Sequence, residues 1–82
     1  MGKSRQVALV IGASSGIGRA TAHLFAVSGF RVFGTSRTQQ PDTDGVEMQR
    51  LDVTSDESVT RCFKEVLMLT GHIDVLVNNA GV

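Results

Sequence analysis

Three glycines near the start of this sequence separate an apolar run from a segment with helical periodicity. Residues 6–11 are almost wholly apolar, which is typical of a strand covered on both faces. Glycines at positions 12, 16 and 18 end that run. From Gly16 onward, apolar and small residues recur at the spacing of one helix face, and Gly29 stands where a glycine commonly ends a helix. The pattern predicts a strand, a glycine turn and a helix in succession.

Three further strands and one further helix are predicted downstream. The strands fall at residues 30–35, 46–53 and 73–77, and a polar loop at 36–45 contains the only proline. The segment from Thr54 to Glu57 has the composition of a capping box, with the Thr54 hydroxyl bonding forward and Glu57 reaching back. Apolar residues at helical spacing follow it, so we expect a helix that ends near Gly71.

The expected order is therefore strand, helix, strand, strand, helix, strand, with a helix between the second and third strands lost or shortened to a loop. Apolar strands that alternate with helices favour an α/β fold, in which a parallel sheet is joined by right-handed crossovers. A ferredoxin-like fold shares the element order, but it predicts antiparallel strands with one polar face. The first and last strands have no polar face, which favours the parallel sheet.

Length and composition narrow the classes of function. A chain of 82 residues forms one small domain or part of a larger one. Lys plus Arg balance Asp plus Glu at 8 each, so no nucleic-acid partner is expected. No apolar run is long enough for a signal segment or a membrane span, and the single Cys62 fits a reducing compartment, so we expect a soluble cytoplasmic protein. Cys62, beside Phe63 on the inward side of a helix, is expected to pack in the core rather than act as a nucleophile.

The glycine turn is the leading candidate for a binding site. Glycine lets the main chain approach a ligand closely, and the following helix presents unpaired N–H groups and the positive end of its dipole. The expected ligand is a pyrophosphate, and Ser14 and Ser15 can bond phosphate or ribose oxygens. The spacing Gly-x-x-x-Gly-x-Gly differs from the usual dinucleotide fingerprint and lacks the Lys-Ser/Thr of a P-loop. The alternative is a purely structural turn between packed elements.

If the pyrophosphate belongs to a nicotinamide dinucleotide, the end of the second predicted strand helps to distinguish NAD from NADP. A fingerprint that prefers NAD has an acidic residue there, which accepts from the ribose hydroxyls. This chain has Thr35-Ser36-Arg37 instead, so no carboxylate repels a phosphate and Arg37 offers a planar cation. The sequence predicts NADP(H) over NAD(H), unless Arg37 is only a solvated surface charge. Arg19, in the first helical turn, either adds its positive charge to that of Arg37 near the phosphate or faces water.

The two remaining strand ends carry polar residues. Asp52, at the end of the third predicted strand, can accept from the amine of an adenine, and Val53 offers that ring an apolar wall, although an Asp in this position is more often a turn or cap residue. The last predicted strand ends in Asn78-Asn79-Ala80-Gly81. Its amides can tie neighbouring strands and a ligand together, and its small residues let a ribose and nicotinamide come close.

Taken together, these motifs resemble the short-chain dehydrogenase/reductase family. The glycine turn at 12–18, Asp52-Val53, Asp74 and the segment 78–81 match the family's motifs in order and at typical spacing. The resemblance covers the whole chain and implies a Rossmann-type, doubly wound parallel sheet that binds a nicotinamide cofactor at the carboxyl ends of its strands. Residues 1–82 would form the amino-terminal part of one such domain, truncated after strands one to four.

The resemblance also implies roles for individual residues. The pyrophosphate and adenosine ribose would be held by Gly12, Ser14, Ser15, Gly16, Ile17 and Gly18. Ser36 with Arg37 would hold the 2′-phosphate, Asp52 and Val53 would flank the adenine, and Asn79, Ala80 and Gly81 would border the nicotinamide ribose. Asp74 and Asn78 would be structural.

The chain departs from the family pattern in two ways. The family usually has a Thr before the first glycine, whose hydroxyl ties the turn to the Asn-Asn-Ala-Gly segment. This chain has Ile11, so we expect a looser turn. The family's catalytic Ser, its Tyr-x-x-x-Lys pair and a supporting Asn have no counterpart here, and the chain contains no tyrosine. No catalytic residue and no metal ligand is therefore assigned.

Three functions remain open from the sequence. The first is the cofactor-binding part of an NADP-dependent oxidoreductase, whose full-length parent reduces carbonyls or oxidises alcohols and forms a homo-oligomer, as the resemblance implies. The second is a non-catalytic nucleotide-binding module. The third is an inactive truncated product, which would expose the apolar strand at 73–77 and aggregate.

Overall fold

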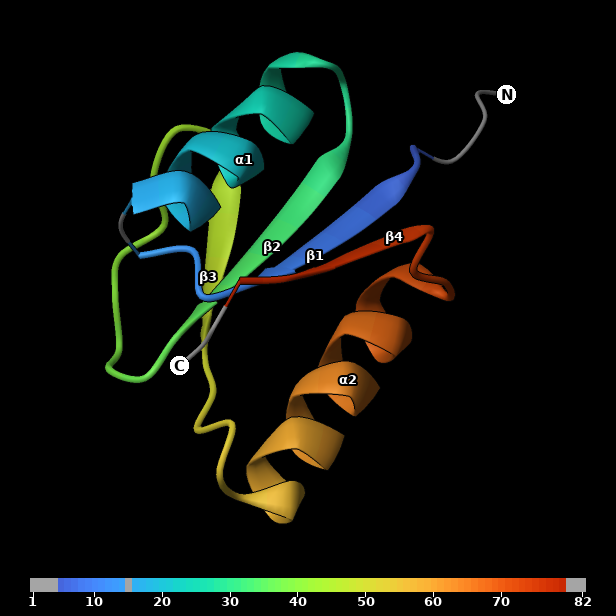
Figure 1. Ribbon diagram of the computed structural model, residues 1–82. Coiled ribbons are helices and arrows are strands. Elements are labelled where there is room, and N and C mark those ends of the chain that lie inside the picture. The colour runs from blue at the N-terminus through green and yellow to red at the C-terminus, as the bar shows by residue number, and fades with distance from the viewer. Residues whose placement is uncertain (1–4, 15, 80–82) are drawn as a thin grey trace.

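Four parallel strands form one sheet with a helix on each face in the computed structural model, which describes residues 5–14 and 16–79 (Figure 1). The elements along the chain are β1 (Val7–Ile11), α1 (Gly16–Val27), β2 (Arg31–Ser36), β3 (Val46–Arg50), α2 (Asp56–Thr70) and β4 (Val75–Asn78). The sheet order is β3-β2-β1-β4, and each neighbouring pair is parallel. This is the order of the first four strands of a Rossmann-type fold, which confirms the predicted class and excludes the antiparallel alternative.

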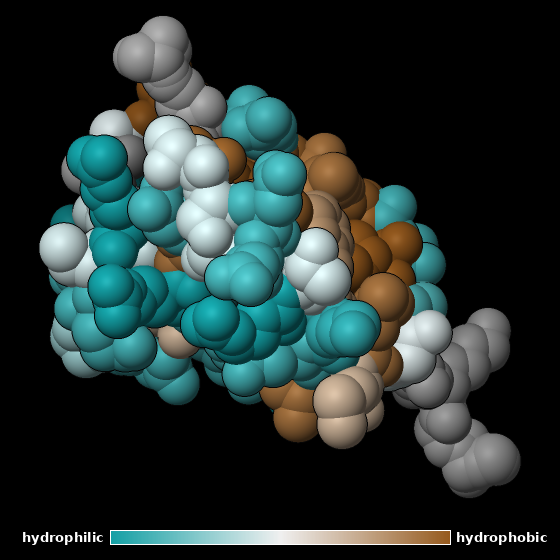
Figure 2. Space-filling view, turned by 90° about the horizontal axis from the view of Figure 1, so that it is seen from below, coloured by the Kyte–Doolittle hydropathy of each residue, from teal (hydrophilic) through white to brown (hydrophobic). Residues whose placement is uncertain are grey.

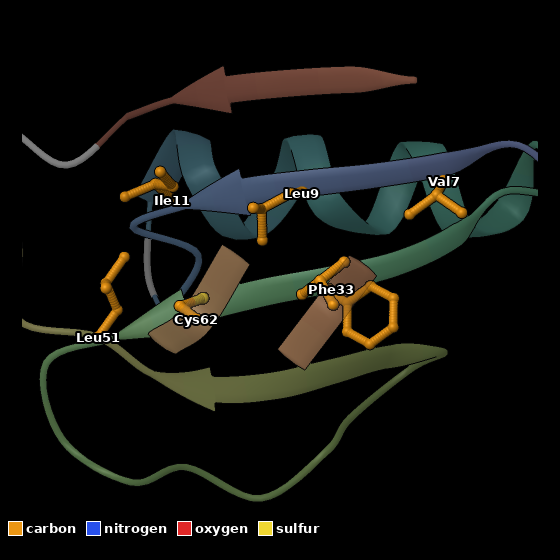
Figure 3. Close-up of a cluster of buried hydrophobic side chains, with 7 residues drawn as sticks. Val7, Leu9, Ile11, Phe33, Leu51 and Cys62 are labelled. Carbon is orange, nitrogen blue, oxygen red and sulfur yellow. The ribbon is translucent and has the colours of Figure 1, made fainter. Parts of the chain in front are cut away.

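β1 lies between β2 and β4 in the sheet and is buried on both faces. Val7, Leu9 and Ile11 belong to the cluster under α2, whereas Ala8 and Val10 pack with α1 residues on the other face. Figure 3 shows the α2-side cluster, in which side chains from β1, β2 and α2 meet. Its members are Val7, Leu9, Ile11, Phe33, Leu51, Cys62 and Val66. The continuous apolar run seen in the sequence is thus explained by two-sided burial.

α1 ends in a Schellman motif built on the predicted glycine. Gly29 has φ 96°, its N–H donates to the Ala26 carbonyl at 3.1 Å, and the Phe30 N–H donates to the Phe25 carbonyl at 3.1 Å. The rings of Phe25 and Phe30 meet edge to face with centroids 4.9 Å apart, which is the apolar contact that accompanies this motif. The prediction of a helix stop at Gly29 is confirmed.

A loop joins β2 to β3 where a further helix would be usual in this kind of fold, and the sequence predicts this loop. Thr43 and Val46 exchange two backbone hydrogen bonds of 2.9 and 3.1 Å across Asp44 and Gly45, whose φ values are 50° and 82°. Positive φ at both central residues is typical of a tight hairpin turn. The Asp42 carboxylate then accepts from the Met48 N–H at 2.8 Å. The loop therefore covers the outer edge of β3, which protects it from pairing with another chain.

α2 begins one residue later than the sequence predicts. The cap is Ser55, whose hydroxyl accepts from the Ser58 N–H at 3.2 Å, so the assignment of Thr54 as the capping residue is wrong. Thr54 instead donates its hydroxyl to the Asp52 carboxylate at 2.6 Å, and its N–H donates to the same oxygen. The turn around Asp52 takes Thr54 away from the helix, and Ser55 is the next residue able to cap it. The helix ends at Gly71, as predicted.

β4 forms the other edge of the sheet and is only partly covered. Val75 and Val77 pack toward the α1-side cluster, but Leu76, on the α2 face beside Leu9, remains 52% exposed. The view from the α2 side shows apolar surface next to a polar region (Figure 2). The large exposed hydrophobic side chains of α2 and β4 are Leu67, Met68, Leu69 and Leu76. Within the described residues, neither helix is long and apolar enough to cross a membrane.

Candidate functional site

The segments that the sequence predicts as a site meet at the carboxyl edge of the sheet. Because all strands run parallel, their carboxyl ends point the same way, and the register pairs Ile11 with Asn78 and Ser36 with Arg50. The glycine turn, the end of β2, the turn after β3 and Asn79 are therefore neighbours along this edge (Figure 1). Ser15, Ala80 and Gly81, also predicted for the site, lie outside the described residues.

The main chain of Gly12 is held from both sides. Its N–H donates to the Thr35 hydroxyl at 3.1 Å, and its carbonyl accepts from the Asn79 side-chain amide at 3.3 Å. Two backbone bonds reinforce these, from the Ala13 N–H to the Thr35 carbonyl at 2.8 Å and from the Asn79 N–H to the Ile11 carbonyl at 2.8 Å. Ile11 itself is buried in the core. Residue 11 has no hydroxyl to tie the turn to the last strand, but the Asn79 side chain makes such a bond, and Thr35 adds a second one from β2.

The three glycines meet two different requirements. Gly12 and Gly16 have φ values of 85° and 61°, a region that other residues rarely adopt. Gly18 lies within α1, where a Cβ would overlap the Gly12 carbonyl oxygen and lie 2.7 Å from the Asn79 amide nitrogen. Gly18 therefore allows the close packing of the helix against the turn, a role assigned to the last glycine of dinucleotide fingerprints.

The head of α1 is an open, electropositive position. The first N–H groups of a helix have no partner within it, and the helix dipole places partial positive charge there. Residues 16–19 include no acidic side chain, whereas the first turn of α2 has Asp56 and Glu57. A Cβ added to Gly16 would meet no atom within 4 Å, so this position is open. An anion at the head of α1 would have room to approach the main-chain donors of the helix end.

Of the two residues predicted to hold the 2′-phosphate at the end of β2, one is buried and one is exposed. Ser36 is buried, and its carbonyl accepts from the Leu51 N–H at 2.9 Å. Arg37 follows on the exposed surface. Its charge is close enough to Asp52 to contribute to lowering the pKa of that carboxyl group. No carboxylate of the β2 segment itself accompanies Arg37, as the sequence predicts.

Asp52 and Val53 lie in a turn beyond β3, not at its end as predicted. β3 stops at Arg50, because the Asp52 carboxylate accepts from both Thr54 donors and turns the chain out of the sheet. Its own N–H donates to the Ser58 hydroxyl at 3.0 Å. The hydrogen bond from the Thr54 side chain is the main cause of the lowered pKa of Asp52. Asp52 is thus an ionised turn residue, beside the half-exposed Val53.

A hollow of about 330 Å³ separates α1 from β3 and its preceding loop. A smaller one of about 160 Å³ adjoins it and reaches Ser14. Ala13, Arg19, Thr43 and Met48 line both. Arg19 therefore borders a space continuous with the glycine turn. The sequence left open whether Arg19 faces water or adds to the electrostatic field of the site; Arg19 is exposed and also borders this hollow, so both alternatives stay open.

The remaining reactive side chains have structural surroundings. Cys62 is buried in the core, where burial raises the pKa of its thiol, so the prediction of a packing role is confirmed. Asp74 accepts from the Val7 N–H and pairs with His72 Nδ1, both at 2.8 Å, which joins the starts of β1 and β4. The expected structural role of Asp74 is confirmed. The described residues contain no group of three or more His, Cys, Asp or Glu that could hold a metal ion.

Two residues that support the site were not identified from the sequence. Thr35 was noted only as part of the strand end, and Ser58 was not singled out. A threonine at the end of an otherwise apolar strand is a weak signal for a bond to a neighbouring turn. No local pattern indicates that the Ser58 hydroxyl accepts from Asp52, because that bond depends on where the helix begins.

Comparisons with known proteins agree with this geometry. The sequence matches the short chain dehydrogenase family over residues 6–82. The 3-ketodihydrosphingosine reductase of Bacteroides thetaiotaomicron is 41% identical over 76 residues, which cover 93% of this chain and 28% of that protein. The ligand-free aldohexose dehydrogenase of Thermoplasma acidophilum has a TM-score of 0.88 at 35% identity, over 96% of this chain and 31% of that one.

A second solved structure extends the comparison. The actinorhodin polyketide ketoreductase with NADPH has a TM-score of 0.86 at 33% identity, over 95% of this chain and 34% of that one. The chain thus spans about a third of the length of the proteins it matches. Sequence motifs, sheet order and glycine turn all lead to one conclusion: the chain belongs to the short-chain dehydrogenase family.

Proposed function

We propose that this chain binds a nicotinamide dinucleotide at the carboxyl edge of its sheet, with the diphosphate at the head of α1. The observation that carries the proposal is the arrangement of the glycine turn. Gly12 is fixed from both neighbouring strands, Gly18 brings the helix against it, and the first turn of α1 is open at Gly16 and carries no acidic side chain of its own. These residues fit a diphosphate, which needs main-chain donors and close approach.

We further propose that the preferred cofactor is NADP(H). Arg37 is exposed at the end of β2, where no acidic side chain of that strand would repel a 2′-phosphate. Arg19 borders the hollow that reaches Ser14, so a second cation lies near the turn. A related ketoreductase of similar structure was solved with NADPH. NAD(H) is the alternative cofactor, and because it has no 2′-phosphate it would gain nothing from Arg37.

The chain is proposed to serve as the cofactor-binding part of a cytoplasmic, homo-oligomeric oxidoreductase acting on a small alcohol or carbonyl compound. When bound, the nicotinamide would supply or accept the hydride. The residues of this chain would bind and orient the nucleotide: Asn79 fixes the end of β4, and the exposed apolar side chains of Ile17 and Val53 offer surfaces that exclude water. The proton transfer is assigned to a Ser and a Tyr-x-x-x-Lys pair, which these 82 residues do not contain.

Titration with NADPH and NADH tests the cofactor assignment directly. We expect NADPH to bind about 10- to 100-fold more tightly, the range for a hydrogen bond between charged groups. Arg37→Ala should remove that difference by weakening NADPH alone, whereas the matched control Arg61→Ala, on the exposed surface of α2, should change neither affinity. Equal affinity of the unaltered chain for both nucleotides would refute the role of Arg37. Binding of neither would refute the cofactor site itself.

A non-catalytic nucleotide-binding module is the second candidate, because every residue proposed for the site serves to bind the nucleotide. Both candidates predict nucleotide binding, so titration does not separate them. Reading the gene beyond codon 82 does: a downstream Ser and Tyr-x-x-x-Lys would support the oxidoreductase, and an authentic stop codon would support the module.

A further inference from the structure

Thr35 is a buried polar residue of β2 that bonds to the glycine turn through both its side chain and its carbonyl group. It is 1% exposed, and Thr35 and Ser36 are the buried polar residues of the described chain. Its hydroxyl accepts from the Gly12 N–H at 3.1 Å, and its carbonyl accepts from the Ala13 N–H at 2.8 Å. One residue of β2 thus anchors two successive peptide groups of the turn that follows β1.

These bonds determine which amides of the turn can face a ligand. Gly12 has φ 85°, a conformation in which the chain reverses direction as it leaves β1. The N–H groups of Gly12 and Ala13 are both used by Thr35, so neither is free to bind a phosphate. The donors left for a ligand are the later ones, at the head of α1. The two bonds to Thr35 therefore orient the turn so that the N-terminal end of α1, rather than Gly12 and Ala13, faces the anion.

The anchor also joins the turn to the residues proposed to recognise the 2′-phosphate. Ser36 and Arg37 directly follow Thr35 along the chain. Movement of the turn relative to β2 would change the distance between the head of α1 and Arg37, and the two bonds to Thr35 oppose that movement. On the opposite side, Asn79 holds the Gly12 carbonyl at 3.3 Å. The Gly12 peptide is thus fixed between β2 and β4.

We infer that Thr35 is a positioning residue for dinucleotide binding, whose hydroxyl sets the glycine turn in the conformation that receives the diphosphate. This inference rests on the proposed function. Valine has nearly the same shape but no acceptor, so Thr35→Val would leave the Gly12 N–H without its partner. Serine keeps the hydroxyl and loses only a methyl group. The pair of variants therefore separates the hydrogen bond from the packing of the side chain.

The test compares two ligands on the 82-residue chain at a temperature where circular dichroism shows each variant to be folded. NADPH spans both the turn and Arg37, whereas adenosine 2′-monophosphate lacks the diphosphate that the turn is proposed to receive. Thr35→Val should weaken NADPH about five-fold, the effect of one neutral hydrogen bond, and leave adenosine 2′-monophosphate unchanged. Thr35→Ser should retain the original NADPH affinity. Thr60→Val, on the exposed surface of α2, is the matched control and should change neither.

Amide hydrogen exchange provides a readout without a nucleotide. The Gly12 N–H should exchange faster in Thr35→Val than in the original chain and in Thr35→Ser. Unchanged Gly12 exchange, or unchanged NADPH affinity in Thr35→Val, would overturn the inference while leaving the cofactor site intact. An equal loss of both ligands would also overturn it, because the defect would then lie at the end of β2. If the unaltered chain binds neither ligand, the proposed function fails first, and the inference fails with it.

Discussion

Replacement of Gly18 by alanine tests whether the close packing of α1 against the turn is essential. The helical backbone at this position suits alanine, so the only obstacle is the added Cβ. That atom would overlap the Gly12 carbonyl oxygen and lie 2.7 Å from the Asn79 amide nitrogen and 2.9 Å from the Gly12 carbonyl carbon. Carbon and oxygen atoms normally stay about 3.3 Å apart, so α1 would have to move away by on the order of 1 Å.

Two opposing contributions decide the magnitude. Alanine stabilises a helix interior by about 0.5–1 kcal/mol relative to glycine. Against this, overpacking beside a backbone atom costs about 1–3 kcal/mol, and loss of the hydrogen bond from Asn79 to Gly12 costs about 1 kcal/mol more. The expected net loss is about 2–3 kcal/mol in the free energy of unfolding. For a domain of this size, that corresponds to a fall in Tm of about 10–20 °C.

Urea and thermal unfolding of the 82-residue chain, followed by circular dichroism, measure this loss. Gly29→Ala is the matched control, because a Cβ there would meet no atom within 4 Å although φ is 96°. It should cost only the strain of a left-handed residue, about 1 kcal/mol. A Gly18→Ala variant as stable as the original chain, or less affected than Gly29→Ala, would refute the argument from packing.

Three further substitutions probe the fold. Asp74→Ala removes the acceptor of the Val7 N–H and the partner of His72, two bonds that lower the pKa of Asp74. Because the carboxylate stabilises the fold above its unfolded pKa of about 4, the loss of stability measured by urea unfolding should shrink as the pH falls through the lowered pKa. A loss of stability that does not depend on pH would contradict this role. Ser55→Ala should cost about 1 kcal/mol as a lost helix cap, whereas an unchanged midpoint would mean that Ser55 is not the cap. Leu76→Lys should reduce self-association through β4 in sedimentation velocity, and equal association of both chains would exclude that edge.

The fold could be predicted from the sequence where burial leaves a pattern. The unbroken apolar run at 6–11 required a strand covered on both faces, and β1 is buried at all five positions. Gly29 and Gly71 were identified as helix ends, because glycine relieves the strain of a left-handed residue. The boundaries were less certain where two neighbours could serve the same purpose. Both Thr54 and Ser55 can cap a helix, and the choice is made by Asp52, which binds Thr54.

The site was predicted in outline but not in its internal bonds. Its segments could be located, because glycine spacing and strand ends are local features of a sequence. The bond from Gly12 to Thr35 joins positions 23 residues apart, and that from Asn79 to Gly12 joins positions 67 apart. Such bonds depend on the sheet order, which no local pattern specifies. The same holds for Asp42, whose carboxylate covers the edge of β3.

Affinity and selectivity should be separable in this site, because they rest on different kinds of group. The diphosphate would be held by main-chain donors, whose direction is fixed by buried bonds between strands and by the packing of Gly18. Selection of the 2′-phosphate is proposed to rest on the exposed side chain of Arg37, which is not part of either core cluster. Changes at the turn should therefore weaken both nucleotides together, and changes at Arg37 should alter only their ratio. A variant of Gly18 that discriminated between NADPH and NADH would show that the two functions are not divided in this way.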